Sequence, residues 1–288
     1  MSFDINQTLP LVLHTKPDSI VAWIESEPVT LQQFLNDVNQ LATQLLPGHH
    51  ILNVCSDRYY FSVGLAAAII TGKVSLLPAT HTPEMANQLK AYAPDVFCLT
   101  DNENCTLALP QLQYPKHVKS SHQLLEVPSI DVNQLVATVF TSGSTGTPLP
   151  HNKTWGSLVT CVKTEAKRVG LNDATASTTL VATVPPQHMY GFESSVLMAW
   201  QSGHAISNTH PFYPLDVCEA ITAVPQPRFL ISTPVHLQAL LDADLPIPET
   251  VAILSATAPL SDTLAVKIEN TCKAPLTEIY GFTETGQI

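Results

Sequence analysis

The strongest constraint on the fold is an alternation of short apolar runs and longer helical patterns, which continues from residue 51 to residue 280. The apolar runs are typical of strands buried on both faces, and the stretches between them are long enough for crossover helices. Repeated β-α alternation favours parallel sheets that are covered by helices on both faces. We therefore predict an α/β fold with largely parallel sheets.

The expected elements follow from these patterns together with turn residues and helix caps. Strands are predicted at Ile51–Cys55, Val74–Leu77, Val96–Leu99, Val136–Phe140, Thr179–Val184, Ala205–Ser207, Phe229–Ser232, Val251–Leu254 and Leu276–Tyr280. Helices are predicted at Tyr59–Thr71, Pro83–Tyr92, Trp155–Val169, Phe192–Gln201, Leu215–Ala223, Pro234–Leu241 and Leu260–Thr271. The polar stretch Asp101–Asp131 predicts a long connection. We expect two packed α/β subdomains, at residues 1–130 and 131–288.

The charge of the chain excludes one class of function. There are 13 Lys and Arg against 24 Asp and Glu, which gives a formal net charge of -11. Such a surface repels phosphate backbones, so general nucleic-acid binding is disfavoured, whereas a loop of backbone N–H groups can still hold a single nucleotide. A hydrophobic fraction of 45% also argues against a disordered chain.

The cysteines and the N-terminus bear on the compartment. The six cysteines contain no CxxC pair and are too few for a disulfide framework, so they predict free thiols and no zinc site. The N-terminal residues lack the basic and apolar regions of a signal peptide. The most apolar stretch, Gly64–Ile70, is far shorter than the ~20 residues that a membrane-spanning helix needs. We expect a soluble cytoplasmic protein with no membrane partner.

The most informative segment directly follows the apolar run Val136–Phe140. It consists of Thr141, Ser142, Gly143, Ser144, Thr145, Gly146, Thr147 and Pro148. Without bulky side chains, successive backbone N–H groups can curl around an anion, and the hydroxyl groups add donors. A strand, such a loop and then a helix form an arrangement that binds phosphate. On these residues alone a plain Ser/Gly/Thr turn is an equal alternative, because the loop is neither GxxxxGK[ST] nor GxGxxG.

This loop resembles the phosphate-loop signature of the adenylate-forming superfamily, which includes acyl-CoA synthetases, luciferases and the adenylation domains of peptide synthetases. Three further segments resemble motifs of that superfamily in the same order: Pro185–Gly191, Ser255–Leu260 and Tyr280–Glu284. The resemblance covers essentially the whole chain. It implies that the two α/β subdomains are the N-terminal core of an adenylate-forming enzyme, with the nucleotide bound by residues 131–288.

The resemblance also implies which residues bind the nucleotide. The loop Thr141–Thr147 would wrap the β- and γ-phosphates of ATP. The backbone of Ala256, Thr257 and Ala258 would border the adenine. Tyr280, followed by Gly281, would lay its flat ring against the base, where an aromatic face gains contact area at little entropic cost.

Three residues are implied in catalysis. His188 would lie between the acyl pocket and the nucleotide, although on its own a histidine in an apolar stretch is more often a structural residue. Thr283 would offer its hydroxyl to the α-phosphate. Glu284 would hold Mg²⁺, a hard cation that prefers carboxylate and phosphate oxygens.

The chemistry that the resemblance implies is attack of a carboxylate on the α-phosphate of ATP, which gives an acyl-adenylate and pyrophosphate. The acyl group would then pass to the thiol of CoA or to the phosphopantetheine arm of an acyl carrier protein. The substrate would be a small-molecule carboxylic acid, either a medium acyl chain or an aryl acid. We expect its pocket around His188–Phe192, Trp200 and Ser232–Pro234.

The sequence departs from the superfamily in two places. Leu149 stands where the phosphate loop usually carries a lysine, and Lys153 is the nearest substitute. The chain also ends at Ile288, before the ribose-binding Asp, the hinge and the lysine-bearing C-terminal domain of the superfamily. We therefore expect an incomplete, weakly active core of a longer AMP-forming ligase. A non-catalytic nucleotide-binding module and one half of a split ligase are the alternatives.

Overall fold

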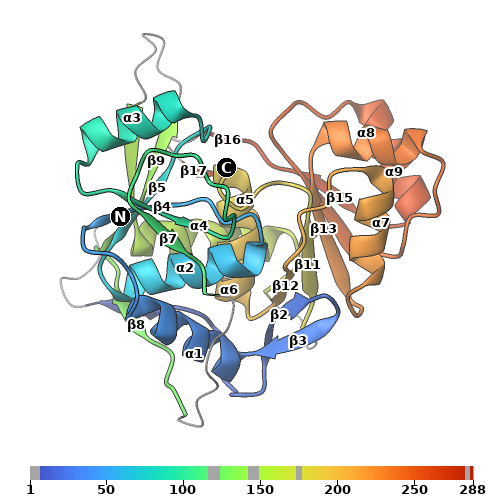
Figure 1. Ribbon diagram of the computed structural model, residues 1–288. Coiled ribbons are helices and arrows are strands. Elements are labelled where there is room, and N and C mark those ends of the chain that lie inside the picture. The colour runs from blue at the N-terminus through green and yellow to red at the C-terminus, as the bar shows by residue number, and fades with distance from the viewer. Residues whose placement is uncertain (1–6, 116–123, 142–148, 173–176, 283–285, 288) are drawn as a thin grey trace.

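Two β-sheets and the helices around them form a layered α/β molecule in the computed structural model (Figure 1). The structure describes residues 7–115, 124–141, 149–172, 177–282 and 286–287. One layer of helices lies between the two sheets, and further helices cover their outer faces. The predicted α/β class with largely parallel, helix-covered sheets is therefore confirmed.

The first sheet has six strands in the order β10-β9-β5-β4-β6-β7. Its strands are β4 (His50–Asn53), β5 (Val74–Leu77), β6 (Phe97–Thr100), β7 (Gln111–Gln113), β9 (Leu135–Thr141) and β10 (Leu149–Thr154). Neighbouring strands are parallel except for the antiparallel pair β9–β10. The inner strands β5 and β6 are buried at every position, which explains their uninterrupted apolar sequences.

The second sheet has seven strands in the order β15-β14-β13-β11-β12-β2-β3. Its strands are β2 (Ile20–Ile24), β3 (Glu27–Thr30), β11 (Thr179–Ala182), β12 (Ala205–Ser207), β13 (Arg228–Ser232), β14 (Ala252–Ser255) and β15 (Leu276–Glu278). Here the antiparallel pair is β2–β3. Two short antiparallel pairs complete the described strands: β1 (Thr8–Pro10) with β8 (Ser129–Asp131), and β16 (Gly281–Phe282) with β17 (Gly286–Gln287).

The helices begin where the sequence supplies caps. Their bounds are α1 (Leu31–Ala42), α2 (Arg58–Ile70), α3 (Pro83–Tyr92), α4 (Trp155–Arg168), α5 (Met189–Gly191), the π-helix η1 (Phe192–Leu197), α6 (Met198–Ser202), α7 (Pro214–Thr222), α8 (Pro234–Asp242) and α9 (Asp262–Cys272). Thr30 forms a capping box with Gln33, and the Asp57 side chain accepts a hydrogen bond from the backbone of Tyr60. None of the helices in the described ranges is long and apolar enough to cross a membrane.

Most of the predicted elements are present with small changes at their ends, and some were missed. The helix predicted at Phe192–Gln201 is the continuous run of α5, η1 and α6 and begins at Met189. The hairpin β2–β3 and the polar strand β10 were not predicted, and the expected connection Asp101–Asp131 contains β7 and β8. The subdomain boundary at residue 131 stays a prediction, but strand pairing crosses it: β2 and β3 join the second sheet, whereas β9 and β10 join the first.

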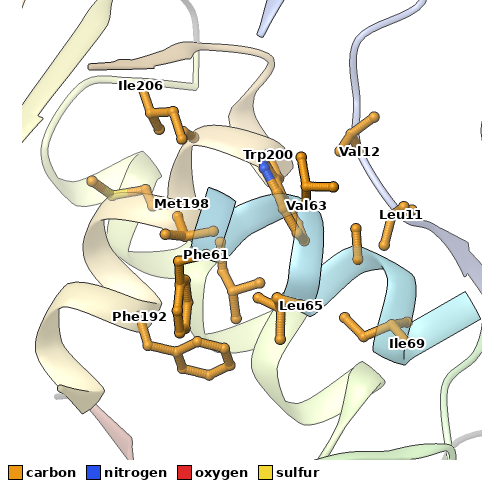
Figure 2. Packing of buried hydrophobic residues seen from close by; sticks show 14 of the residues in the cluster. Leu11, Val12, Phe61, Val63, Leu65, Ile69, Phe192, Met198, Trp200 and Ile206 are labelled. Atoms are coloured by element: carbon orange, nitrogen blue, oxygen red, sulfur yellow. The ribbon is translucent and has the colours of Figure 1, made fainter. Parts of the chain in front are cut away.

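The main core fills the space between the two sheets (Figure 2). Helix α2 is buried on nearly all sides, as expected for a helix whose residues are almost all apolar or small. Phe61 from α2 lies beside Phe192 and Met198 in this layer. Trp200 is fully buried, and its ring centroid lies 5.6 Å from that of Phe34. The central helices therefore hold the two sheets at a fixed distance from one another.

Candidate active site

A pocket lies where the carboxyl ends of strands from both sheets converge. It has a volume of about 230 Å³. Its walls come from the ends of β5 and β9 in the first sheet and from the segment after β11 in the second. They are lined by Leu77, Pro78, Ala79, Val139, Phe140, Thr141, Gln187, His188 and Met189. Carboxyl ends of parallel strands are the usual place for ligands in α/β folds.

Thr141 forms the edge of the pocket on the side of the first sheet. It is the last residue of β9 and pairs with Leu149, the first residue of β10. Its hydroxyl forms a hydrogen bond of 3.0 Å with Nε2 of His151. The predicted phosphate-loop residues Ser142, Gly143, Ser144, Thr145, Gly146 and Thr147 lie outside the described residues. The end of β9 and the paired start of β10 therefore lie at this edge of the pocket.

His188 forms the opposite edge of the pocket and is the N-cap of α5. Its Nδ1 accepts a hydrogen bond of 3.3 Å from the backbone N–H of Tyr190. The surrounding protein lowers the pKa of His188, so the ring is neutral at pH 7. Because Nδ1 is an acceptor, the neutral ring carries its proton on Nε2. That nitrogen can donate to an oxygen of a bound reactant.

Close contacts hold the segment that carries His188. A side chain at Gly191 would overlap the backbone carbonyl of Pro185, so only glycine fits there. The side chain of Gln187 donates a hydrogen bond to the backbone carbonyl of Cys55, which follows β4 in the first sheet. The segment is therefore attached to both sheets at once.

Tyr190 ties this segment to the neighbouring strands of the second sheet. Its hydroxyl lies 3.1 Å from the backbone oxygen of Ser232, at the end of β13, and 3.1 Å from that of Leu254, in β14. The ring is buried. The single hydroxyl proton is within reach of both carbonyl oxygens, so Tyr190 links the two strands beside the pocket.

A buried arginine reinforces the end of β11. Nη2 of Arg58 donates hydrogen bonds of 2.9 and 2.8 Å to the backbone oxygens of Ala182 and Val184, and Nη1 donates one of 2.6 Å to Oγ of Ser195. Complete burial lowers the pKa of Arg58 to about 10, so the guanidinium remains charged at neutral pH. The charge of Arg58 thus connects α2, η1 and the strand that leads to His188.

The ends of β14 and β15 carry the residues predicted to contact adenine. Ala256 is buried, whereas Thr257 and Ala258 are exposed. Thr257 has a φ of 79°, a left-handed conformation that a β-branched residue rarely adopts. Tyr280 lies two residues after the end of β15 and is 64% exposed. An exposed aromatic ring beside a strained loop is a surface on which a flat base can stack.

Lys153, the predicted substitute for the loop lysine, is buried in β10 and is only 8% exposed. Burial raises the pKa of Glu193 in η1 to about 7, and the positive charge of Lys153 opposes that rise. Burial also raises the pKa of the neighbouring Glu165 to about 8. Lys153 therefore acts electrostatically on the helices between the sheets, and its contact with phosphate stays a prediction.

The structure brings some of the predicted site residues together and places others elsewhere. Thr141 and His188 share the pocket, and Ala256, Thr257, Ala258, Tyr280 and Gly281 lie at the ends of β14 and β15. Thr283 and Glu284 lie outside the described residues.

The expected acyl pocket around His188–Phe192, Trp200 and Ser232–Pro234 stays a prediction. Trp200 and Phe192 are fully buried in the core and do not line the pocket described above (Figure 2). Met189 lines it and lies within the expected range, whereas Pro78 and Gln187 line it and were not predicted as site residues. A sequence signal was available for Pro78, because it directly follows an apolar strand and so lies at a carboxyl end.

The described residues contain no group of three or more His, Cys, Asp or Glu side chains that could hold a metal ion. This finding is compatible with Mg²⁺, which binds through phosphate oxygens, water and one or two carboxylates rather than through a cage of protein ligands. The carboxylate predicted for that purpose, Glu284, is outside the described ranges.

Comparisons with known proteins agree with this geometry. A region of 152 residues is 31% identical to a 4-coumarate–CoA ligase of Halorhodospira halophila and covers 52% of this chain and 36% of that protein. A region of 148 residues is 32% identical to a 4-coumarate–CoA ligase of Rhodobacter capsulatus and covers 51% of this chain and 37% of that protein. These alignments thus span little more than a third of either relative.

Solved structures share the fold at low sequence identity. The o-succinylbenzoate CoA synthetase of Bacillus subtilis in complex with AMP superposes with a TM-score of 0.77 at 18% identity, covering 97% of this chain and 60% of that chain. ATP-bound MatB from Rhodopseudomonas palustris superposes with a TM-score of 0.77 at 14% identity, covering 94% of this chain and 58% of that chain. Residues 12–288 match the family described as AMP-binding enzyme. The chain belongs to this family of adenylate-forming enzymes.

Proposed function

We propose that this chain takes part in the ATP-dependent activation of a small carboxylic acid and in the transfer of its acyl group to a thiol. The observation that carries the proposal is the pocket between Thr141 and His188, at the facing carboxyl ends of the two sheets. Membership of the AMP-binding family supports the nucleotide, and the two CoA ligases among its relatives support the thiol.

In the proposed complex, ATP lies across the ends of β9, β14 and β15. The backbone of Thr141–Thr147 binds the β- and γ-phosphates, and Lys153, near the carboxyl end of β10, is the proposed source of positive charge. The loop Ala256–Ala258 borders the adenine, while Tyr280 stacks on it and Gly281 leaves room beside the ring. The exposure of Tyr280 and the left-handed Thr257 support this arrangement, because both lie at a surface that a base can cover.

Mg²⁺ would bind to Glu284 and to phosphate oxygens, where it neutralises charge on the leaving pyrophosphate. Thr283 would donate to the α-phosphate. Residues that the structure describes would orient the acid and exclude water. The neutral ring of His188 donates from Nε2 and orients an oxygen of the acid, and the pocket walls exclude water from the reacting atoms.

The proposed reaction has two steps. A carboxylate oxygen forms a bond to the α-phosphorus of ATP, the bond to the bridging oxygen breaks, and pyrophosphate leaves with the electron pair. A thiolate then attacks the acyl carbon and releases AMP. We propose CoA as the thiol, with a carrier-protein phosphopantetheine as the other acceptor of the same chemistry. The six free thiols of the chain suit a reducing compartment such as the cytoplasm.

A nucleotide-binding module without catalysis, or one half of a split ligase, is the second candidate. The observation that favours it is the position of Lys153, whose side chain is buried and whose charge acts on Glu193 rather than at the surface. As a separate fact, the chain spans about 60% of the length of the solved structures that it matches. Both candidate functions use the same nucleotide site, and they differ in whether this chain alone turns over substrate.

The test is calorimetric titration of Mg²⁺-ATP and of AMP, followed by hydroxamate trapping with a panel of carboxylic acids. We expect saturable nucleotide binding that Glu284→Ala weakens for Mg²⁺-ATP and leaves nearly unchanged for AMP, because AMP lacks the β- and γ-phosphates. Hydroxamate formation that His188→Ala slows would support the ligase. Binding without hydroxamate would favour the second candidate, and a folded chain that binds neither nucleotide would contradict both.

A further inference from the structure

The turn between β4 and α2 lies against the segment that carries His188. The turn consists of residues 55–58, and the segment, residues 184–195, leads from β11 through α5 into η1. Among the described residues, side-chain contacts join the two before, beside and after His188. Arg58 makes the first and the last of these contacts, and it belongs to none of the motifs that resemble the superfamily. One side chain from a distant part of the chain therefore holds both ends of the segment.

The first contact fixes the point where the segment begins. Nη2 of Arg58 donates a hydrogen bond of 2.9 Å to the backbone oxygen of Ala182 and one of 2.8 Å to that of Val184. Ala182 ends β11, and Val184 directly precedes Pro185. The backbone N–H of His188 donates a hydrogen bond of 3.2 Å to the oxygen of Pro185. The guanidinium therefore acts one residue away from the backbone bond that places His188.

The second contact fixes the point where the segment enters η1. Nη1 of Arg58 donates a hydrogen bond of 2.6 Å to Oγ of Ser195, and the hydroxyl of Ser195 donates to the backbone oxygen of Gly191. Both side chains are fully buried. Gly191 is also confined by the carbonyl group of Pro185, which leaves no room for a side chain. Arg58 therefore holds Gly191 through a single serine.

The third contact lies beside His188. The side chain of Gln187 donates a hydrogen bond to the backbone oxygen of Cys55, at the start of the turn. On the other side, the backbone N–H of Phe192 donates a hydrogen bond of 2.8 Å to the oxygen of His188. The ring itself is oriented by the hydrogen bond of 3.3 Å from the N–H of Tyr190 to Nδ1. The orientation of the ring therefore depends on a backbone that the turn holds in place.

A stabilising role alone does not explain why Arg58 is buried. Its side chain is fully buried, and among the described residues no carboxylate forms an ion pair with it. The charge of Asp57 attracts it, but the two oxygens of Asp57 accept hydrogen bonds from Tyr60 and Asn208. Moving a guanidinium out of water without a paired carboxylate is costly. What the guanidinium supplies is geometry, because a planar fork of fixed donors can hold three acceptors at once.

We infer that Arg58 is a positioning residue for His188. The inference rests on the proposed function, in which Nε2 of His188 donates to an oxygen of the acid. Arg58 does not line the pocket, and it acts by holding the two ends of the segment. Without the guanidinium the ends lose three hydrogen bonds. The bond at Nδ1, already long at 3.3 Å, is then the next to break, and the ring turns away from the acid.

The test is Arg58→Met, studied by ¹⁵N NMR of the histidine rings, with the His188 signals assigned from their loss in His188→Gln. At pH 8 we expect the parent ring to carry its proton on Nε2 only, and the ring in Arg58→Met to be a mixture of tautomers. Hydroxamate formation at saturating Mg²⁺-ATP should fall about tenfold, while nucleotide affinity should change by about twofold at most. Arg168→Met is the matched control, because it removes an exposed guanidinium from α4 and should alter neither readout.

A second variant covers the case in which Arg58→Met does not fold, as shown by circular dichroism. Ser195→Ala keeps the guanidinium and removes the link to Gly191, so it should give a smaller fraction of the second tautomer. Arg58→Met decides the matter if it folds, and otherwise Ser195→Ala decides it. An unchanged single tautomer in the deciding variant would overturn the inference even if that variant is less stable, because the role would then be structural only. A mixture of tautomers in the parent would overturn it as well.

The NMR measurement needs no nucleotide, which separates this inference from the proposed function. If Arg58→Met changes the tautomer of His188 in a chain that forms no hydroxamate, the positioning of the ring is supported and the ligase is contradicted.

Discussion

Two segments follow strand ends of the second sheet that are separated by β13, and they are built in different ways. The segment Pro185–Gly191, after β11, is held by hydrogen bonds to both sheets and by the close approach at Gly191. The loop Ala256–Pro259, after β14, is mostly exposed and contains a residue in a left-handed conformation. One side of the site is therefore rigid before any ligand binds, and the other is open and strained.

The difference in rigidity between the two segments suggests different roles for them. A rigid wall beside His188 positions the reacting atoms without further ordering at the moment of reaction. An exposed, strained loop has few contacts to lose, so a nucleotide can reshape it at low cost. We therefore expect substitutions in the first segment to act on stability and those in the second to act mainly on nucleotide affinity.

The largest effect is expected for Gly191→Ala. The added methyl group would overlap the carbonyl oxygen of Pro185, so the segment must shift, at a cost of about 3 kcal/mol. Urea unfolding monitored by circular dichroism measures the change. Gly170→Ala is the matched control, because nothing lies near its missing side chain, and its positive φ costs only about 1 kcal/mol. Equal losses for the two variants would show that the close approach at Gly191 has no special role.

A smaller loss is expected for Tyr190→Phe. The substitution keeps the ring but removes the hydroxyl that lies 3.1 Å from two strand-end carbonyls, which should cost about 1–2 kcal/mol. Tyr92→Phe is the control, since Tyr92 is 43% exposed and no hydrogen bond of its hydroxyl is found within the described part of the chain. If both variants unfold at the same urea concentration as the parent, the rigid segment does not depend on Tyr190.

Local sequence patterns predicted much of the fold but not the pairings that join distant parts of the chain. Helix α3 has the predicted bounds, and the structure shows a local reason for its start: Thr82 caps it and Pro83 occupies its first turn. The hairpin β2–β3 was missed because β2 pairs in the sheet with β12, which lies about 180 residues later in the sequence, and local patterns do not show such a distant contact. Strand β10 was missed because its residues are mostly polar.

The candidate site shows the same limit. Thr141 and His188 were predicted from motifs that are continuous in the sequence. Pro78 and Gln187 were not predicted, because they reach the pocket only through the convergence of β5, β9 and the segment after β11. The burial of Trp200 against Phe34 likewise depends on a helix that is distant in sequence. Motifs thus located the chemistry, whereas packing decided which neighbours surround it.

On the open side of the site, a chain with glycine at position 257 should be more stable to unfolding than a chain with alanine there. At a φ of 79° a residue with a Cβ is strained, whereas glycine is not, so Thr257→Gly should exceed Thr257→Ala in unfolding free energy by about 1 kcal/mol. Ala258→Gly is the control, since Ala258 is not among the residues with positive φ and there glycine should be the less stable choice. An alanine variant at position 257 that equals the glycine variant would contradict the strain.

The smallest effect concerns the pH dependence that His188 adds to stability. Its pKa in the folded chain lies below the ordinary histidine value of about 6.5 because burial disfavours the charged ring. Above pH 6.5 the ring is neutral in both states and contributes no dependence on pH. As the pH falls below 6.5, the unfolded chain binds a proton that the folded chain resists, so stability is lost until the folded pKa is reached.

His188→Gln should therefore lose less stability than the parent between pH 6.5 and pH 5, as measured by urea unfolding at several pH values. The difference should be small, because the ring lies at the rim of the pocket and is partly solvated. Parallel curves for parent and variant would mean that His188 is as free in the folded chain as in the unfolded one, and the rigid side of the site would then end at Gln187.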